Sequence, residues 1–280
     1  MEVQWEHGGA VKINIMEKKF RFEVCANGVE SCLAAQEGGA DRVELCAGIP
    51  EGGTTPSFGE IKAARRLMQR TRLHVIIRPR GGDFLYTKLE LERMLDDIRV
   101  CRDLGVDGVV IGCLNADGTI DMDANRQLVA AAKGPLHSIN EEDPSKTPRQ
   151  MSVTFHRAFD RCRNPKEALE QLVELGVDRV LTSGQQPTAY DGIPLLRSLQ
   201  QQAAGRIVIL AGCGVNERNI RCIQEQTGVC EFHFSAREPV KSGMEYINPD
   251  VYMGDKSADE GTLMYTSADR VRATIGQLLF

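Results

Sequence analysis

Two neighbouring segments of the chain each contain a glutamate two residues before a cysteine. Glu23 and Cys25 lie in FEVCA, and Glu44 and Cys46 lie in VELCA. Side chains two residues apart point to the same face of a β-strand, so each segment presents a carboxylate and a thiol together. Carboxylates transfer protons and thiolates bind soft metal ions. If the two segments are adjacent strands, both kinds of group meet on one wall.

Other polar side chains lie near the ends of apolar, β-branched runs. The catalytic candidates are Glu23, Glu44, His156 and Asp160, the anion-binding arginines are Arg78 and Arg80, and the further polar residues at strand ends are Thr182 and His233. A buried carboxylate or guanidinium group without a partner costs several kcal/mol, so these groups must pair. We expect Glu23 or Glu44 to pair with Arg78.

Glycine turns follow several of the same runs. The segment AGCGVN contains Gly212 and Gly214 and leads into a helical pattern, and Ser235 ends the next apolar run. Backbone N–H groups at such a turn, together with a helix N-terminus, can hold a phosphate group. Gly212, Gly214 and Ser235 are therefore candidates for anion binding.

The elements that must position these residues repeat one phrase. GGADRVELC, LGVDGVVIGC, LGVDRVLTSG and TGVCEFHFSA each place a glycine before a short strand. Four further strand patterns, near residues 20, 74, 152 and 207, alternate with them, so eight strands are expected near residues 20, 42, 74, 108, 152, 179, 207 and 231. Helical patterns separate them, at 29–38, 57–69, 89–105, 164–176 and 216–228.

Alternation of strand and helix predicts parallel strands joined by right-handed crossovers. Eight such units form an α/β fold of the single-domain (β/α)8, or TIM-barrel, type, with a last helix near 267–279 closing it. A doubly wound open sheet is the alternative, but the G-x-G-x-x-G turn that usually follows its first strand is missing after FEVCA.

Three segments depart from the repeat. Residues 1–19 form an N-terminal extension before a barrel of residues 20–280. Residues 138–150 are polar and proline-containing, and we expect an inserted mobile loop. Residues 238–267 make a long connection after the eighth strand, which would serve either as a lid over the barrel mouth or as a tail wrapped around the barrel.

Composition excludes several classes of function. The net charge is −5 and the basic residues are scattered, so we expect no nucleic-acid partner, and no apolar stretch is long enough for a membrane span. The nine cysteines lie mostly in strand or helix patterns, which is typical of free thiols in the cytoplasm. No lysine lies on an expected strand, so Schiff-base catalysis from a strand end is not expected.

Five ordered motifs resemble the CutC family of copper homeostasis proteins. They are EVCANGVESCLAAQEGGADRVELCAGIPEGGTTPS, IRPRGGDF, VTFHRAFD, DRVLTSG and EFHFSA. The resemblance covers roughly residues 20–255 and implies a TIM barrel, a cytoplasmic location (or a nuclear one as well), a homo-oligomer (dimer or tetramer) and a Cu(I) site at Cys25 and Cys46. Cys213 stands where the family often has glycine, and 138–150 looks like an insertion.

Two functions therefore stay open. The first is copper homeostasis with Cu(I) held by Cys25 and Cys46, which agrees with the preference of this ion for thiolates. The second is an enzyme that acts by acid–base chemistry on a small phosphorylated or carboxylated metabolite. The expected ligand is thus either a copper ion or a small anion. The cysteines have a plainer explanation as well, since free cysteine is often a small buried hydrophobe.

Overall fold

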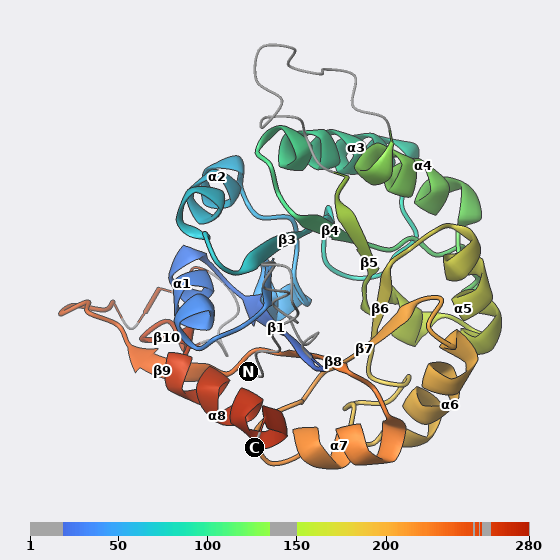
Figure 1. The fold of residues 1–280 in the computed structure, drawn as a ribbon. Helices are drawn as coiled ribbons and strands as arrows, with labels where there is room; N and C mark the ends of the chain where they lie inside the picture. Colours follow the sequence, from blue (N-terminus) through green and yellow to red (C-terminus); the bar gives the residue numbers. More distant parts are fainter. Residues whose placement is uncertain (1–18, 135–149, 249, 252, 254–258, 280) are drawn as a thin grey trace, which may run out of the picture.

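The expected barrel is present. In the computed structural model, which describes residues 19–134, 150–248, 250–251, 253 and 259–279, eight parallel strands pair in sequence order and the last pairs with the first (Figure 1). The strands are β1 Arg21–Ala26, β2 Arg42–Leu45, β3 Arg72–Ile76, β4 Gly108–Ile111, β5 Ser152–Phe155, β6 Arg179–Thr182, β7 Val208–Gly212 and β8 Glu231–Phe234. The TIM-barrel prediction is confirmed.

Helices surround this barrel and alternate with its strands (Figure 1). They are α1 Val29–Glu37, α2 Phe58–Leu67, α3 Lys88–Asp103, α4 Met122–Lys133, α5 Pro165–Glu174, α6 Ile193–Ala203, α7 Ile220–Thr227 and α8 Ala268–Leu279, with short 3-10 helices η1 Ile49–Glu51 and η3 Arg157–Arg161. No helix among these described residues is both long and apolar enough to cross a membrane.

Local sequence explains where these helices begin. Ser57 accepts a hydrogen bond from the N–H of Glu60, and Thr87 with Glu90 forms a complete capping box. Asn164 caps α5, whose first residue is Pro165, a position where the missing proline N–H leaves no bond unmade. Because each helix starts directly after a loop at the same end of the barrel, the strand ends that carry the polar residues are held in fixed positions.

Two glycines, the first residue of β4 and the residue directly after that strand, make room for imidazole rings. A Cβ atom on Gly108 would lie 2.5 Å from the ring of His74, and one on Gly112 would lie 2.6 Å from the ring of His156. Real Cβ atoms do not approach other atoms this closely. The two glycines at the ends of the fourth strand therefore leave room for the rings of two buried histidines.

An ionic network fills the barrel interior near the amino ends of the strands. Glu23 is fully buried and pairs with Arg42, which also donates to Glu231 at 2.8 Å. Arg179 lies 3.4 Å from the same Glu231 carboxylate. The expected pairing of Glu23 or Glu44 with Arg78 was wrong. Register explains the error, because Glu23 lies directly opposite Arg42 on the neighbouring strand, whereas Arg78 lies beyond the end of β3.

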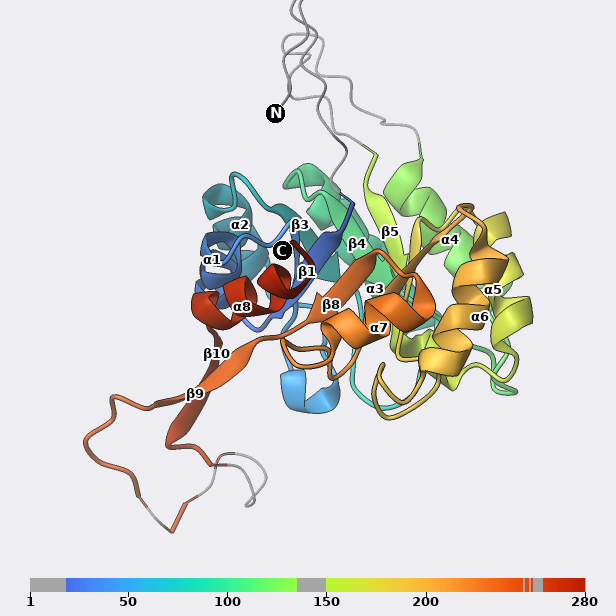
Figure 2. The same ribbon diagram turned by 60° about the horizontal axis from the view of Figure 1, so that its bottom comes forward.

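The segment after β8 leaves the barrel. β9 Arg237–Lys241 and β10 Thr262–Thr266 pair antiparallel, and together they project away from the barrel body (Figure 2). The described residues of 238–267 thus form neither a lid closed over the mouth nor a tail wrapped around the barrel. We call strands β9 and β10 with the described residues between them the arm. Residues 1–18 and 135–149, where we expected an extension and a mobile insertion, lie outside the described residues.

Candidate functional site

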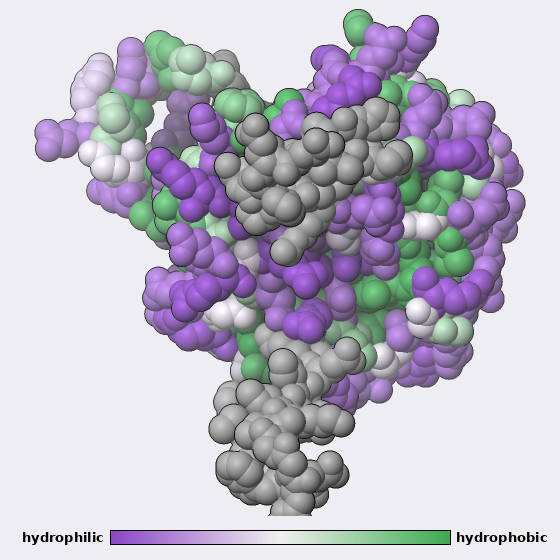
Figure 3. All heavy atoms as spheres, turned by 45° about the horizontal axis from the view of Figure 1, so that its top comes forward, coloured by the Kyte–Doolittle hydropathy of each residue, from purple (hydrophilic) through white to green (hydrophobic). Residues whose placement is uncertain are grey.

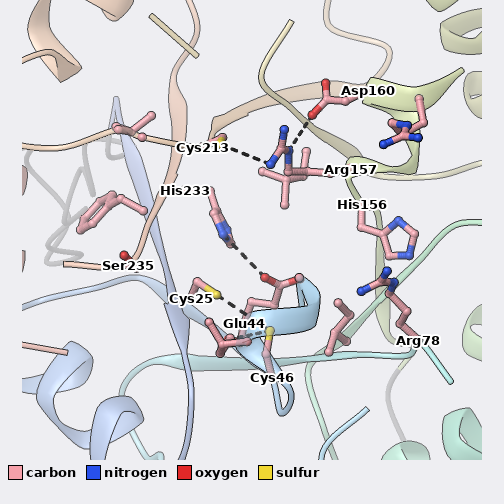
Figure 4. Close-up of a pocket in the computed structure, with 18 of the residues that line it drawn as sticks. Cys25, Glu44, Cys46, Arg78, His156, Arg157, Asp160, Cys213, His233 and Ser235 are labelled. Carbon is pink, nitrogen blue, oxygen red and sulfur yellow. Dashed lines mark hydrogen bonds and ion pairs between the residues drawn. The ribbon is translucent and has the colours of Figure 1, made fainter. Parts of the chain in front are cut away.

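A cavity of about 460 Å³ opens at the carboxyl ends of the strands. Nine of the predicted site residues line it, together with three arginines that the sequence analysis did not single out (Figure 4). The predicted nine are Cys25, Glu44, Cys46, Arg78, His156, Asp160, Gly214, His233 and Ser235, and the added arginines are Arg157, Arg161 and Arg237.

The two cysteines of the repeated pattern face each other. Their Sγ atoms lie 3.9 Å apart, on adjacent strand ends, and an Nη atom of Arg237 lies 3.2 Å from Cys25 Sγ. The hydrogen bond from Cys46 and the nearby charges of His233 and Arg237 hold the pKa of Cys25 well below its ordinary value. The hydrogen bond to Cys25 and burial raise the pKa of Cys46. In this pair Cys25 is therefore the thiol that loses its proton more readily.

His233 links this pair to the glutamates. Its Nδ1 lies 2.7 Å from Glu23 Oε1, and its Nε2 lies 3.6 Å from Glu44 Oε2. Burial opposes its protonation, but hydrogen bonds to Cys25 and Glu23 raise the pKa of His233 well above its ordinary value. Glu23 does not line the cavity. It lies one layer below and fixes the orientation of the imidazole.

Glu44 belongs to the only group of three potential metal ligands found among the described residues. Ligand atoms of Cys25, Glu44 and His233 all lie within 4.8 Å of one another. Burial, which dominates here, raises the pKa of Glu44 to about 8, so its carboxyl group is mostly protonated at neutral pH. A group in this state can give a proton or, after losing it, coordinate a metal ion.

His156 lies on the opposite wall. Its Nδ1 accepts a hydrogen bond from the N–H of Ala158 at 3.2 Å, which leaves the ring proton on Nε2. That Nε2 atom is buried and has no partner among the described residues. Burial, with the charge of Arg78, lowers the pKa of His156 to about 3, so the ring is neutral.

The two predicted arginines occupy different environments. Arg78 is buried in the cavity wall and donates to the backbone carbonyls of Glu51, Gly53 and Gly82 at 2.8–3.0 Å. Arg80 does not line the cavity, because its guanidinium group turns outward to Asp83 and to Glu90 at 2.9 and 2.7 Å. The structure therefore does not bring Arg80 to the cavity with the other candidates.

Thr182 and Gly212 also lie outside the cavity lining. On β6 the residue that lines the cavity is Leu181, and Thr182 instead donates to Asp160 at 2.5 Å. Thr182 thus holds a lining residue in place without reaching the mouth itself. Gly212 lies under the lining, where a Cβ atom would meet the side chain of Leu181 at 2.4 Å. The missing side chain of Gly212 leaves room for Leu181.

The arginines missed from the sequence lie beside predicted residues. Arg157 follows His156 directly, and its Nε lies 2.7 Å from Asp160 while one Nη lies 3.2 Å from Cys213 Sγ. Arg237 comes just after Ser235. A rule that includes the first residues after a strand, as well as its inward-facing ones, would have found both Arg157 and Arg237.

The backbone at the mouth contains left-handed residues. Cys213 has φ of 79° and the next residue, Gly214, has φ of 73°. A residue with a Cβ atom adopts this region at a cost of about 1–2 kcal/mol. A glycine at position 213 would avoid that cost.

Fold and site together define a class of protein. A closed (β/α)8 barrel carries, at the carboxyl ends of its strands, a polar cavity with a thiol pair, a buried imidazole and several arginines. A model of the CutC family matches residues 20–238, and the chain belongs to this family.

Individual relatives cover nearly the whole chain. A CutC family protein of Bacteroides thetaiotaomicron is 60% identical over 259 residues, which is 92% of this chain and 98% of that protein. One of Parabacteroides distasonis is 54% identical over 255 residues, 91% of this chain and 98% of the relative. The solved structure of CutC from Streptococcus agalactiae is 33% identical, with a TM-score of 0.69, and covers 77% of this chain and 98% of its own.

Proposed function

We propose that this protein binds one Cu(I) ion between Cys25 and Cys46 and serves in copper homeostasis. The observation that carries the proposal is the thiol pair, whose sulfur atoms lie 3.9 Å apart in the wall of an open cavity. Thiolates select soft ions such as Cu(I) over Mg²⁺ or Ca²⁺. The S. agalactiae relative is itself named a putative copper homeostasis protein, which supports the same role for this chain.

The spacing of the sulfur atoms fits a site with a third ligand. A metal–sulfur bond is about 2.3 Å long, so two sulfurs 3.9 Å apart subtend about 116° at a shared ion. That angle is close to trigonal and far from linear. The imidazole of His233 and the carboxyl group of Glu44 both have a ligand atom within 4.8 Å of Cys25 Sγ. His233 is the better match, since imidazole suits copper and carboxylate suits harder ions.

Metal binding would compete with protons at this site. A Cys25 thiolate is already favoured, whereas Cys46 must lose its proton and His233 must become neutral to act as a ligand. Cu(I) affinity should therefore fall as the pH falls. A site of two sulfur atoms and one imidazole also suits Zn²⁺ less well, because Zn²⁺ normally takes four ligands.

Two further properties belong to this proposal. Nine free cysteines suit a reducing compartment, so we propose that the protein acts in the cytoplasm or the nucleus. We also propose that it is a homo-oligomer, either a dimer or a tetramer, with the arm as part of the contact.

A titration with Cu(I) against a competing chelator tests the proposal under anaerobic, reducing conditions. The wild type should bind one ion that the Cys25→Ser, Cys46→Ser double variant does not. The matched control is Cys222→Ser with Cys230→Ser, which removes two other solvent-accessible thiols and should leave the stoichiometry unchanged. Equal stoichiometry in the wild type and the first double variant would contradict the proposal.

A further inference from the structure

The cavity is much larger than the cysteine pair requires. Its volume of about 460 Å³ falls within the range of about 300–1,000 Å³ typical of small-molecule sites. From Cys25 and Cys46 it extends across the mouth to Arg157 and Asp160, which lie on the far side in Figure 4. The space beyond the thiols is therefore available to a second kind of ligand.

Positive charge exceeds negative charge in the lining. Arg78, Arg157, Arg161 and Arg237 contribute four guanidinium groups, against the carboxyl groups of Glu44 and Asp160. Asp160 is already paired with Arg157. Arg78, Arg161 and Arg237 form no ion pair with a carboxylate anywhere in the described part of the chain. A surplus of this kind in a concave site attracts anions.

Several donors in the lining are still available. The side chain of Arg161, the last residue of η3, is exposed and makes no hydrogen bond or ion pair to another described residue. Arg157 directs one Nη atom to Cys213 and the other to Ser183, so each keeps a second N–H. Planar guanidinium groups with free N–H pairs bind phosphate in a bidentate manner.

An independent feature of the same wall points to a ligand. His156 is 3% exposed, and its Nε2, which carries the ring proton, is buried and has no partner among the described residues. Buried polar groups in folded proteins are almost always hydrogen-bonded, so this donor calls for an acceptor that is absent from the protein itself. An anion held by the neighbouring arginines would bring acceptor oxygens to this wall.

The remaining lining is apolar. Ile76, Phe84, Leu181 and Val215 face the same cavity, next to the arginines. We propose that the mouth binds a small phosphate monoester, with its phosphate group on Arg157 and Arg161 and its organic part on this apolar wall. The site does not depend on metal binding at the cysteines.

Isothermal titration calorimetry of the metal-free, reduced protein tests this proposal with inorganic phosphate and phenyl phosphate as probes. Both should bind, and phenyl phosphate should bind more tightly because its ring reaches the apolar wall. Arg161→Gln should weaken both by about tenfold, the effect of removing one hydrogen bond between charged groups. Because the exposed side chain of Arg161 makes no hydrogen bond or ion pair with the described residues, this variant should fold normally.

Arg163→Gln is the matched control. Arg163 lies two residues further along, is 64% exposed and pairs loosely with Asp117, outside the cavity. This variant removes the same charge and should bind both probes like the wild type. An equal loss in both variants would show a diffuse field without a site and would overturn the proposal, as would an absence of binding by the wild type.

Two more outcomes separate the parts of the proposal. Equal affinity for inorganic phosphate and phenyl phosphate would overturn the assignment of the organic part. The Cys25→Ser, Cys46→Ser double variant should keep its affinity for both probes. Loss of phosphate binding in that variant would overturn the independence of this site from the thiol pair, whatever the copper titration shows.

Discussion

At the scale of single residues, the site combines groups whose charges depend on their neighbours. Glu23 is fully buried, and although burial opposes its ionisation, Arg42 and His233 keep its pKa well below the ordinary value. This fixed negative charge keeps His233 protonated, and the imidazolium in turn favours a thiolate on Cys25. Glu23, which does not line the cavity, thus acts on Cys25 through His233, beside the larger effect of the hydrogen bond from Cys46.

His156 should make the protein sensitive to acid. Its pKa is lowered to about 3 by burial and by Arg78, whereas an unfolded histidine titrates near pH 6.5. As the pH falls from about 6.5 toward 3, the unfolded chain takes up this proton and the folded chain does not. The stabilisation from a neutral, buried ring is therefore fully present above about pH 6.5 and is lost progressively below it.

Urea denaturation of the wild type and of His156→Gln at pH 7 and pH 5 measures this contribution. Between these values the wild type should lose about 2 kcal/mol more of its free energy of unfolding than the variant, whose residue 156 does not titrate. The comparison cancels the effect of the other histidines. An identical pH dependence in the two proteins would show that His156 is protonated, or solvated, in the folded state.

At the scale of elements, the barrel was the easiest part to predict. The glycine before each strand and the β-branched run after it predicted strands starting near residues 42, 108, 179 and 231, where β2, β4, β6 and β8 begin. Such signals are local, so strands can be predicted from them without knowledge of tertiary contacts. The pairing of charges is not local. Arg42 was missed as the partner of Glu23 because it lies at the start of its strand.

Which residue of a strand faces inward was the second limit. Polar character suggested Thr182, but the residue that lines the cavity is Leu181. Thr182 lies outside the lining and donates a hydrogen bond to Asp160. The rule that polar residues face a functional mouth fails where a polar residue supports another one. In contrast, Cys25 and Cys46 were placed correctly, because two copies of one pattern on adjacent strands constrain each other.

The glycine at the start of β4 should be essential for packing inside the barrel. Gly108→Ala places a Cβ atom 2.5 Å from the ring of His74, which is buried and cannot retreat. Overpacking of this kind typically destabilises a protein by about 1–3 kcal/mol. Chemical denaturation should show that loss for Gly108→Ala.

Gly276→Ala serves as the comparison for the same chemical change. Gly276 lies in α8 with no atom near its would-be Cβ, and its backbone is not left-handed. Alanine should stabilise that helix by up to about 1 kcal/mol. If Gly108→Ala were as stable as the wild type, the account of how β4 admits the histidines would be wrong.

At the scale of the whole molecule, the arm is the feature that the barrel does not explain. Eight of its residues are large, hydrophobic and exposed, and in Figure 3 it stands clear of the barrel at the upper left with hydrophobic residues among hydrophilic ones. They are Val240, Met244, Tyr246, Ile247, Val251, Met253, Leu263 and Met264. Large apolar side chains gathered on one exposed segment usually mark a contact with another protein.

If the arm contributes to a homo-oligomer, replacing its apolar side chains by polar ones should dissociate the oligomer. Light scattering coupled to size-exclusion chromatography should find a dimer or tetramer for the wild type, and a smaller species when Met244, Tyr246 and Ile247 are changed together to serine. The control is Phe58→Ser with Leu89→Ser, which removes exposed apolar side chains of the barrel body. A wild type that is monomeric at micromolar concentration would exclude this role for the arm.

The central claim concerns the ligands of the copper ion. X-ray absorption at the copper edge, recorded on protein loaded with one equivalent of Cu(I), measures them directly. We predict two sulfur neighbours at about 2.3 Å and one lighter nitrogen or oxygen neighbour, with the lighter neighbour altered in a His233→Gln variant. A single sulfur neighbour, or a spectrum unchanged by the Cys25→Ser, Cys46→Ser double variant, would contradict the account.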